Sequence, residues 1–161
     1  MTYYDDISEG YEELHKEEQL KKVELISLYL KVDKGDKLLD VGCGTGLTTQ
    51  PWNCRRYGID PAKKLIEKAR SKDKDIEYKI AAAEDIPYED SLFDIVISVT
   101  AIQNFQNIEK GLKEIKRVGK KRFVLSFLRN SPKRRIIEKL IKELFEIKKE
   151  IEEDKDIIFI Q

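Results

Sequence analysis

The positions of apolar and polar residues along the chain predict helices and strands that alternate. From Leu14 to Leu30, apolar residues recur at roughly helical spacing among Glu and Lys, which predicts a helix that ends before a turn at residues 34–36. Short apolar runs bounded by turn residues predict strands, because a strand buried on both faces needs no polar alternation. The expected strands are Lys37 to Val41, Tyr57 to Ile59, Ile76 to Ala81, Phe93 to Val99 and Arg122 to Leu128.

Two of these strands differ in a way that predicts their places in the sheet. Ile76 to Ala81 alternates apolar and polar residues, as a half-exposed edge strand does. Phe93 to Val99 is nearly continuous apolar and β-branched sequence, which is typical of the centre of a parallel sheet.

Helices are expected between the strands and after the last of them. Pro61 is placed to occupy a first helical turn, and that helix runs through Ala69. Asn107 to Val118 predicts the next helix. Ser131 followed by Pro132 predicts a cap with proline at the first helical position, and the helix runs to about Leu144.

The C-terminal part of the chain predicts a hairpin. Phe145 to Ile151 and Asp156 to Ile160 flank a charged turn at residues 152–155. Strands and helices that alternate and end in a hairpin predict an α/β three-layer fold. The length predicts a single domain of residues 1–161, in which residues 1–34 form an N-terminal leader and helix.

Three glycines at alternate positions, Gly42, Gly44 and Gly46, directly follow the first strand. Glycine permits positive φ and lets a ligand lie against the backbone, so the pattern indicates a nucleotide-type turn; a tight turn without a ligand is the alternative. A dinucleotide fingerprint needs its third glycine at position 47, which is Leu47. No Gly-Lys-Ser/Thr of a Walker A loop follows either, so NAD and nucleoside triphosphates are disfavoured.

Two aspartates stand where the first two strands end. Asp40 precedes the glycines, where a carboxylate repels a pyrophosphate and attracts a cation such as S-adenosylmethionine, which carries an ammonium and a sulfonium. The alternative for Asp40 is a turn carboxylate that binds backbone groups. Asp60 is placed to accept hydrogen bonds from both ribose hydroxyls or to cap the helix at Pro61, and the two roles can coexist.

The segment Leu38 to Gly46 resembles motif I of class I S-adenosylmethionine-dependent methyltransferases. Tyr57 to Pro61 resembles their acidic second motif, Ala81 to Tyr88 the region that follows their third strand, and Asp94 to Val99 their fourth strand. The resemblance spans nearly the whole chain. It implies a Rossmann-like, mostly parallel sheet of seven strands whose last strand is antiparallel, formed here by the C-terminal hairpin.

The resemblance also implies a cofactor site. The Asp60 equivalent holds the ribose, the Leu65 equivalent packs on adenine, and the segment at Ala82 borders the adenine edge. The cofactor-binding residues expected from it are Asp40, Gly42, Cys43, Gly44, Thr45, Gly46, Asp60, Pro61, Leu65, Ala82, Ala83, Glu84, Val99 and Thr100.

The chain departs from the family pattern in two places. Ala82 stands where the family often has an Asp that contacts the adenine amino group, and Glu84 or Asp85 is expected to substitute for it. The stretch from Leu47 to Tyr57, with Pro51 near its start, leaves room for roughly one turn of the usual first helix. One flank of the sheet is therefore expected to need cover from the N-terminal helix or from a partner.

The segment Thr100 to Phe105 follows the fourth strand at the carboxyl edge, where α/β sheets bind ligands. The stretch Ser98 to Gln103 is similar to the corresponding stretch of ribosomal-RNA guanine-N7 methyltransferases, although Asn104 and Phe105 depart from their Trp-Leu. Several enzymes of that group work with a small zinc-binding activator subunit. We expect the acceptor near Gln103 and Asn104, with Tyr11 of the leader as a further wall. The alternatives are an ordinary turn with a capping Asn and a Tyr that packs the leader on the core.

The chemistry of methyl transfer favours some acceptors over others. Displacement at a sulfonium relies on positioning, and a nitrogen with a free lone pair needs no base. His15 is the only histidine, so nitrogen and carbon acceptors are favoured slightly over oxygen. A basic cluster follows the fifth strand and favours RNA, although a solvated helix face is the alternative; its residues are Arg129, Lys133, Arg134 and Arg135. We expect methyl transfer to a nitrogen of an RNA base, with a small-molecule methyltransferase or a non-catalytic partner of the same fold as alternatives.

Composition excludes several other classes of protein. Lys plus Arg and Asp plus Glu number 31 each, so no basic coat covers the whole chain. Charged residues make up 39% of the chain, and the richness in Lys, Glu and Ile resembles proteins of heat-loving organisms. Cys43 and Cys54 form no CxxC pair, so reduced thiols and no metal site are expected. No apolar run approaches about 18 residues and no signal peptide is recognisable, which predicts a cytoplasmic protein without a membrane partner.

Overall fold

The computed structural model describes the backbone of residues 9–161, with side chains from Glu13 on. The chain divides into two compact units between Lys31 and Val32. The described part of the first unit contains the helix α1 (Glu9–Ser27), which begins earlier and ends earlier than expected. It ends because Leu28 N–H donates to the carbonyl of Leu25, three residues back, and so leaves the α-helical pattern.

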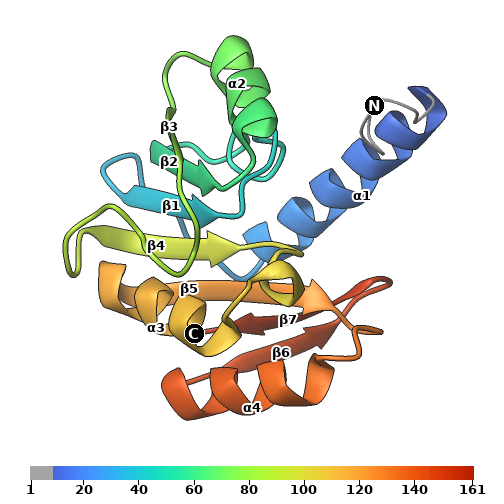
Figure 1. The fold of residues 1–161 in the computed structure, drawn as a ribbon, viewed down its shortest axis with the longest axis vertical. Coiled ribbons are helices and arrows are strands. Elements are labelled where there is room, and N and C mark those ends of the chain that lie inside the picture. Colours follow the sequence, from blue (N-terminus) through green and yellow to red (C-terminus); the bar gives the residue numbers. More distant parts are fainter. Residues whose placement is uncertain (1–8) are drawn as a thin grey trace. The chain divides into compact units, whose positions relative to one another are not determined.

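The second unit is built on one sheet of seven strands (Figure 1). Its strands are β1 (Lys37–Val41), β2 (Arg55–Asp60), β3 (Glu77–Ile80), β4 (Phe93–Ser98), β5 (Gly119–Leu128), β6 (Lys149–Glu152) and β7 (Asp156–Ile160). The order across the sheet is β3-β2-β1-β4-β5-β7-β6. The first five strands of this order pair in parallel, and β7 is antiparallel to both β5 and β6. The expected mostly parallel sheet with an antiparallel C-terminal hairpin is therefore confirmed, with β4 at the centre and β3 at an edge.

Helices cover the two faces of this sheet in the expected three layers. They are α2 (Lys63–Lys72), α3 (Ile108–Val118) and α4 (Arg134–Leu144), with a short 3-10 helix η2 (Ile102–Asn104) after β4. Figure 1 shows α3 and α4 on the same face, where they bury one core with alternate residues of the strands. Ile59 belongs to this core, whereas Gly58, its neighbour in β2, lies against the ring of Tyr78 on the face that α2 covers. Successive strand residues point to opposite faces, so this alternation separates the layers.

The large core holds the sheet and the two helices together. Leu112, Ile115 and Val118 of α3 are fully buried, as are Phe127 and Phe159 of the strands beneath. The rings of Phe127 and Phe159 are stacked at a centroid distance of 5.9 Å. Each such side chain contributes about 1.5–3 kcal/mol by leaving water, so the core fixes the strand ends that carry the site.

Strands β2 and β5 begin two and three residues earlier than expected, at Arg55 and Gly119. Three further predicted boundaries were wrong, each because a local hydrogen bond or a core contact prevails. Asp60 Oδ1 accepts from the N–H of Ala62, so α2 begins at Lys63 and not at Pro61. Ser131 Oγ accepts from the N–H of Lys133 and forms a turn, so it does not cap α4, which begins at Arg134. Phe145 packs its ring against Phe123 in the core, and β6 begins only at Lys149.

The helix expected to begin at Asn107 begins at Ile108, because Asn107 is its N-cap and accepts at Oδ1 from the N–H of Lys110 at 3.0 Å. Of the helices in residues 9–161, none is both long and apolar enough to span a membrane.

Candidate functional site

The glycine loop crosses from β1 toward α2 in a conformation that glycine alone adopts easily. The φ angles of Gly42, Gly44 and Gly46 are +78°, +54° and +92°. A Cβ on Gly42 would lie 2.5 Å from Cβ of Ala101, and a Cβ on Gly46 would collide with Oη of Tyr78. Packing within the protein therefore explains Gly42 and Gly46. Gly44 differs, because a Cβ there would meet nothing within 4 Å, so the middle of the loop faces open space.

The segment after the loop makes one helical turn in place of a full helix, as expected. The N–H groups of Thr49 and Gln50 both donate to the carbonyl of Gly46. Trp52 then closes the turn, since its side chain is buried and its Nε1–H donates to the carbonyl of Thr48 at 2.9 Å. This turn places two threonine hydroxyls beneath the loop.

Asp40 lies fully buried beneath this turn. Its Oδ2 accepts from the hydroxyls of Thr48 at 2.6 Å and Thr49 at 2.7 Å, so the carboxylate anchors the turn through side chains rather than backbone groups. Within the described part of the chain, its Oδ1 has no hydrogen-bond partner. Burial raises the pKa of Asp40 to about 6, against the lowering effect of the two hydroxyls. The sequence missed Thr48 and Thr49, which show no signal beyond being polar in a buried turn.

Asp60 joins the glycine loop to the start of α2. Its Oδ2 accepts from the N–H of Gly44 at 3.0 Å, and its Oδ1 accepts from the N–H of Ala62 at 2.9 Å. Each carboxylate oxygen can accept a second hydrogen bond. The cap that was the alternative for Asp60 is not formed, because Ala62 is the N-cap of α2 and the bond from Ala62 N–H to Asp60 closes a turn before the helix. This arrangement leaves acceptor capacity at the loop.

The side chains expected around adenine differ in how far they are buried. Ala83 is buried, whereas Leu65, Ala82, Glu84, Thr45 and Pro61 are half-buried or exposed. Glu84 Oε2 accepts from the N–H of Asn107 at 2.9 Å, so this carboxylate is partly engaged at the start of α3. Asp85 is exposed. Of Glu84 and Asp85, the two residues expected to substitute for the missing Asp, only Glu84 has its carboxylate hydrogen-bonded at the start of α3.

Cys43 lies in the loop as a free, buried thiol. Burial and the nearby aspartates raise the pKa of Cys43 far above its usual range, so it stays protonated and is no nucleophile. Cys54 is also free. Among the side chains from residue 13 on, no three of His, Cys, Asp and Glu come together in a way that could hold a metal ion.

The end of β4 holds a strained residue. Thr100 follows the buried Val99 and has a φ of +56°, which is rare for a β-branched residue and costs about 1–3 kcal/mol. Its N–H donates to Ser126 Oγ at 2.9 Å and its hydroxyl donates to Asp156 Oδ2 at 2.6 Å. Ser126 Oγ also donates to Asp156 Oδ2. Polar residues within the apolar β5 and β7 were the signal that could have found this network.

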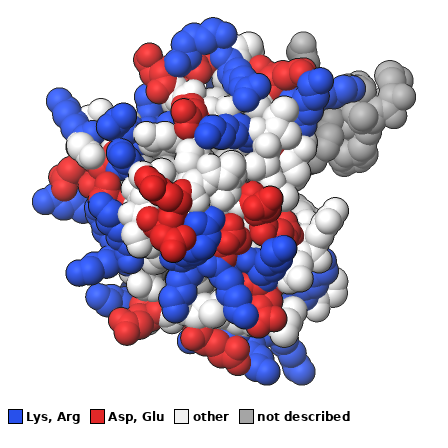
Figure 2. All heavy atoms as spheres, turned by 60° about the vertical axis from the view of Figure 1, so that its left-hand side comes forward, with Lys and Arg blue, Asp and Glu red and all other residues white. Residues whose placement is uncertain are grey.

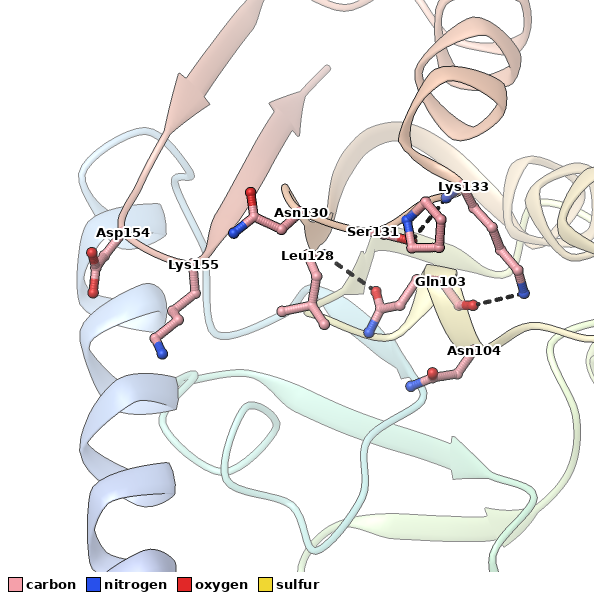
Figure 3. Close-up of a pocket in the computed structure, with 9 residues that line it drawn as sticks. Gln103, Asn104, Leu128, Asn130, Ser131, Lys133, Asp154 and Lys155 are labelled. Atoms are coloured by element: carbon pink, nitrogen blue, oxygen red, sulfur yellow. Dashed lines mark hydrogen bonds between the residues drawn. The ribbon is translucent and has the colours of Figure 1, made fainter.

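A pocket of about 500 Å³ opens between the ends of β4 and β5 and the turn of the β6–β7 hairpin (Figure 3). Its lining residues are Gln103, Asn104, Leu128, Asn130, Ser131, Pro132, Lys133, Asp154 and Lys155. Gln103 Nε2 donates to the carbonyl of Thr100 at 2.9 Å, and Gln103 Oε1 accepts from the N–H of Leu128 at 3.3 Å. Its amide therefore ties the ends of β4 and β5 together, whereas Asn104 exposes its side chain at the pocket.

The structure brings one of the four predicted cations to this pocket. Lys133 lines it, and its Nζ donates to the carbonyl of Gln103 at 3.2 Å. Arg134 is instead paired with Glu138 at 2.8 Å and Glu152 at 3.0 Å. Arg129 and Arg135 do not line the pocket. Tyr11 lies in α1, but its side chain is outside the described residues.

Residues 39–127 match the protein family described as "Methyltransferase domain". An uncharacterized protein of Methanocaldococcus jannaschii is 31% identical over 118 residues, which cover 73% of this chain and 46% of that protein. The C-methyltransferase UbiE of ubiquinone and menaquinone biosynthesis from Campylobacter jejuni is 32% identical over 114 residues, which cover 65% and 48%. The chain spans about half the length of the curated relatives it matches.

Solved structures share the fold at lower sequence identity. A protein of Pyrococcus horikoshii aligns with a TM-score of 0.77 at 22% identity, covering 98% of this chain and 96% of that one. The complex between the Haloferax volcanii Trm112 methyltransferase activator and a methyltransferase aligns with a TM-score of 0.66 at 21% identity, covering 74% and 57%. These likenesses show the fold alone.

Proposed function

Because this chain belongs to the methyltransferase domain family, we propose that it binds S-adenosylmethionine on the glycine loop and transfers the methyl group to an acceptor in the pocket beside Gln103 and Asn104. The observation that carries the proposal is the open space at Gly44, whose positive φ no packing contact explains. Asp60 holds the N–H of this same residue, so a carboxylate with spare acceptor capacity lies at the open part of the loop.

The residues present fit this cofactor in charge as well as in space. Asp40 and Asp60 are both acidic, and Asp40 keeps one buried carboxylate oxygen without a hydrogen bond from the described residues. A cationic ligand compensates such an oxygen, whereas a pyrophosphate is repelled. When bound, the cofactor supplies an electrophilic methyl group with a good leaving group. The chain's own part is to hold the loop through Asp60, line the adenine with Leu65 and Ala82 to Glu84, and position the acceptor.

The pocket favours an acceptor that attacks with a lone pair. No histidine, cysteine or tyrosine is among the residues that line it, and its carboxylate, Asp154, lies on the hairpin side away from Gln103 and Asn104 (Figure 3), so no general base lies beside these two amides. The amide and lysine side chains of the lining can hold an acceptor by hydrogen bonds. A neutral ring nitrogen or amine reacts under these conditions, because it needs orientation and no deprotonation. We therefore infer a nitrogen acceptor of about the size of one nucleobase, which a pocket of about 500 Å³ accommodates.

An RNA base is one carrier of such a nitrogen. Lys133 at the pocket and the exposed Arg135 nearby in α4 are placed to contact phosphates. Other observations favour a small molecule. Arg134 is neutralised by two carboxylates, and on the face drawn in Figure 2 acidic and basic side chains lie interspersed, with uncharged areas between them. The relative UbiE is a C-methyltransferase of ubiquinone and menaquinone biosynthesis, and this supports a small-molecule acceptor for the present chain.

Labelling distinguishes these acceptors. The protein is incubated with S-adenosylmethionine carrying a tritiated methyl group and with host extract separated into RNA and small-molecule fractions. Label in RNA supports a base acceptor, and label in small molecules alone overturns it. If the protein binds the cofactor but labels neither fraction, a non-catalytic role replaces the proposed transfer.

We also propose that a small zinc-binding activator protein covers the free edge of β3. Within the described residues β3 pairs only with β2, and Ile80 at its end is 46% exposed. An unpaired edge with exposed apolar residues is a site for another chain to add a strand. A solved structure with the same fold is a complex between a methyltransferase and the Trm112 methyltransferase activator, which supports the proposal of an activator partner. A fully active monomer whose activity does not rise on co-expression with the host's activator overturns it.

A further inference from the structure

We propose that the pocket selects an acceptor with one anionic group, a carboxylate or a phosphate, which Lys133 holds; this rests on the proposed function and names its substrate class. Lys133 lines the pocket and forms no ion pair with a carboxylate of the described residues. Its Nζ donates only to the carbonyl of Gln103 at 3.2 Å. An ammonium has three donors, so further hydrogen bonds remain available at this point of the pocket.

Most neighbouring cations of α4 are neutralised by carboxylates. Arg134 is paired with Glu138 and Glu152, Lys139 with Glu143, and Lys142 with Glu150, whereas the exposed Arg135 lies outside the pocket lining. A pocket cation that forms no ion pair is a place where an anion from outside completes the charge balance.

The wall that carries Lys133 is held in place before any ligand arrives. Ser131 Oγ accepts from the N–H of Lys133 at 3.1 Å, and Ser131 N–H donates to the carbonyl of Leu128. Arg134 Nη1 donates to the carbonyl of Arg129, which fixes the same connection from the helix side. These bonds fix the backbone on which Lys133 is mounted, so only its side chain has to be ordered when an anion binds.

The opposite wall is the hairpin turn. Glu153 Oε1 accepts from the N–H groups of Lys155 at 2.9 Å and Asp156 at 2.8 Å, which locks the turn. Asp154 and Lys155 lie on this side of the pocket, and Lys133 lies on the other side of Leu128 (Figure 3). Asp154 disfavours an anion near it, so the anionic group is oriented toward Lys133.

The surface between the two walls fits a ring. Leu128 is 38% exposed and lines the pocket together with Pro132, so an apolar floor lies between the polar walls. Asn104 and Asn130 supply amide donors and acceptors at the rim. A planar ring that carries a nitrogen nucleophile and one anionic substituent matches this arrangement. We infer that the acceptor is a free small molecule rather than RNA, because only Lys133 of the four basic residues that follow β5 lines the pocket.

Two pairs of probes test the charge preference directly. The two members of each pair share the same ring system, and only the first is an anion. The pairs are 2-aminobenzoate with 2-aminobenzamide, and adenosine monophosphate with adenosine. Binding is measured on the full chain at low salt by fluorescence or NMR titration. In at least one pair the anion is expected to bind about threefold to tenfold tighter than its neutral partner, as a partly exposed charge-assisted contact provides.

Three variants connect the preference to Lys133. Lys133→Gln is expected to abolish the preference and Lys133→Arg to retain it. Lys116→Gln, which removes an exposed lysine near the C-terminal end of α3 outside the pocket lining, is expected to leave it unchanged. Equal binding within both pairs, or a preference that survives in Lys133→Gln, overturns the proposal. So does failure of both anions to bind at about 10 mM, the weak limit of specific recognition, including the case in which a single-stranded RNA oligonucleotide binds instead.

Calorimetry with S-adenosylmethionine on the same proteins separates this proposal from the one on which it rests. The proposed function fails if the unmodified chain does not bind the cofactor, whatever the probes do. The anion preference fails if Lys133→Gln keeps it while cofactor binding is normal. Thermal unfolding of each variant shows whether the fold is retained.

Discussion

Asp60 Oδ2 accepts a hydrogen bond from the backbone N–H of Gly44 at 3.0 Å, so the carboxylate expected at the ribose also holds the middle of the glycine loop. The two residues come from the ends of neighbouring parallel strands, β1 and β2. Any substitution of Asp60 therefore acts on the shape of the loop and on the ligand together, and the variants below separate these effects.

Asp60→Ala is expected to weaken S-adenosylmethionine binding by about tenfold or more, because charge-assisted hydrogen bonds of roughly 1.5–3 kcal/mol are lost. Calorimetry on the unmodified chain should give a micromolar dissociation constant, about −8 kcal/mol, and no measurable binding of NAD. Glu89→Ala, at an exposed position outside the site, is the matched control. Unchanged affinity in Asp60→Ala would remove Asp60 from the cofactor site.

The glycines are expected to respond to alanine in two different ways. Gly46→Ala places a methyl group against Oη of Tyr78, so it should lower the free energy of unfolding by about 2–4 kcal/mol, and Tyr78→Phe should recover part of that loss. Gly44→Ala meets no atom within 4 Å, so it should cost only about 1 kcal/mol, from its positive φ.

The same Gly44→Ala variant should nevertheless lose cofactor binding, because its methyl group occupies the open space that the ligand needs. Denaturant unfolding and calorimetry on both variants measure the two effects. A Gly44→Ala protein that binds the cofactor normally would show that the open space serves another purpose.

Asp40 is expected to make stability depend on pH in an unusual direction. Its pKa is about 6 in the folded state and ordinarily 3.8, so the folded chain binds more protons between about pH 4 and pH 6. The contribution of Asp40 to the free energy of unfolding therefore falls as pH rises through that window, by about 3 kcal/mol at most. Asp40→Asn cannot titrate, so its stability relative to the unmodified chain should rise from pH 4 to pH 7.

Denaturant unfolding at several pH values measures this difference, with the exposed Asp75→Asn as control. A difference that stays constant over pH would mean that Asp40 titrates normally. A cationic cofactor prefers the ionised carboxylate, so affinity for S-adenosylmethionine should increase between about pH 5 and pH 7 in the unmodified chain and stay flat in Asp40→Asn.

Gln103→Ala is expected to slow methyl transfer by about tenfold while the dissociation constant of the cofactor changes less than about twofold. The amide of Gln103 joins the carbonyl of Thr100 to the N–H of Leu128, so its removal loosens the pocket and leaves the glycine loop intact. Gln106→Ala, exposed and outside the pocket lining, is the control. Single-turnover rates with labelled cofactor and the acceptor identified by labelling provide the measurement.

The sequence determined the features that depend on local pattern. The parallel strands, the edge position of β3, the C-terminal hairpin and the single turn before Pro51 all follow from hydrophobic period, turn residues and proline, because each property is fixed by neighbours in the chain. The glycine loop was predicted from one contiguous segment, and the methyltransferase family from short motifs that follow successive strands, each of which is a local pattern. Helix starts were predicted less well, since a hydrogen bond such as that from Ala62 N–H to Asp60 shifts a boundary by one or two residues.

Only the tertiary structure decided which polar side chains are engaged with the protein and which face a pocket. Four basic residues follow β5 in the sequence, yet Lys133 alone lines the pocket, because Glu138 and Glu152 neutralise Arg134 from α4 and from the hairpin. Thr100 is held in its strained conformation by Ser126 and Asp156, which lie 26 and 56 positions away in the chain. Contacts of this kind depend on strands that pair across the sheet, and a linear pattern records the type of a side chain but not its partner.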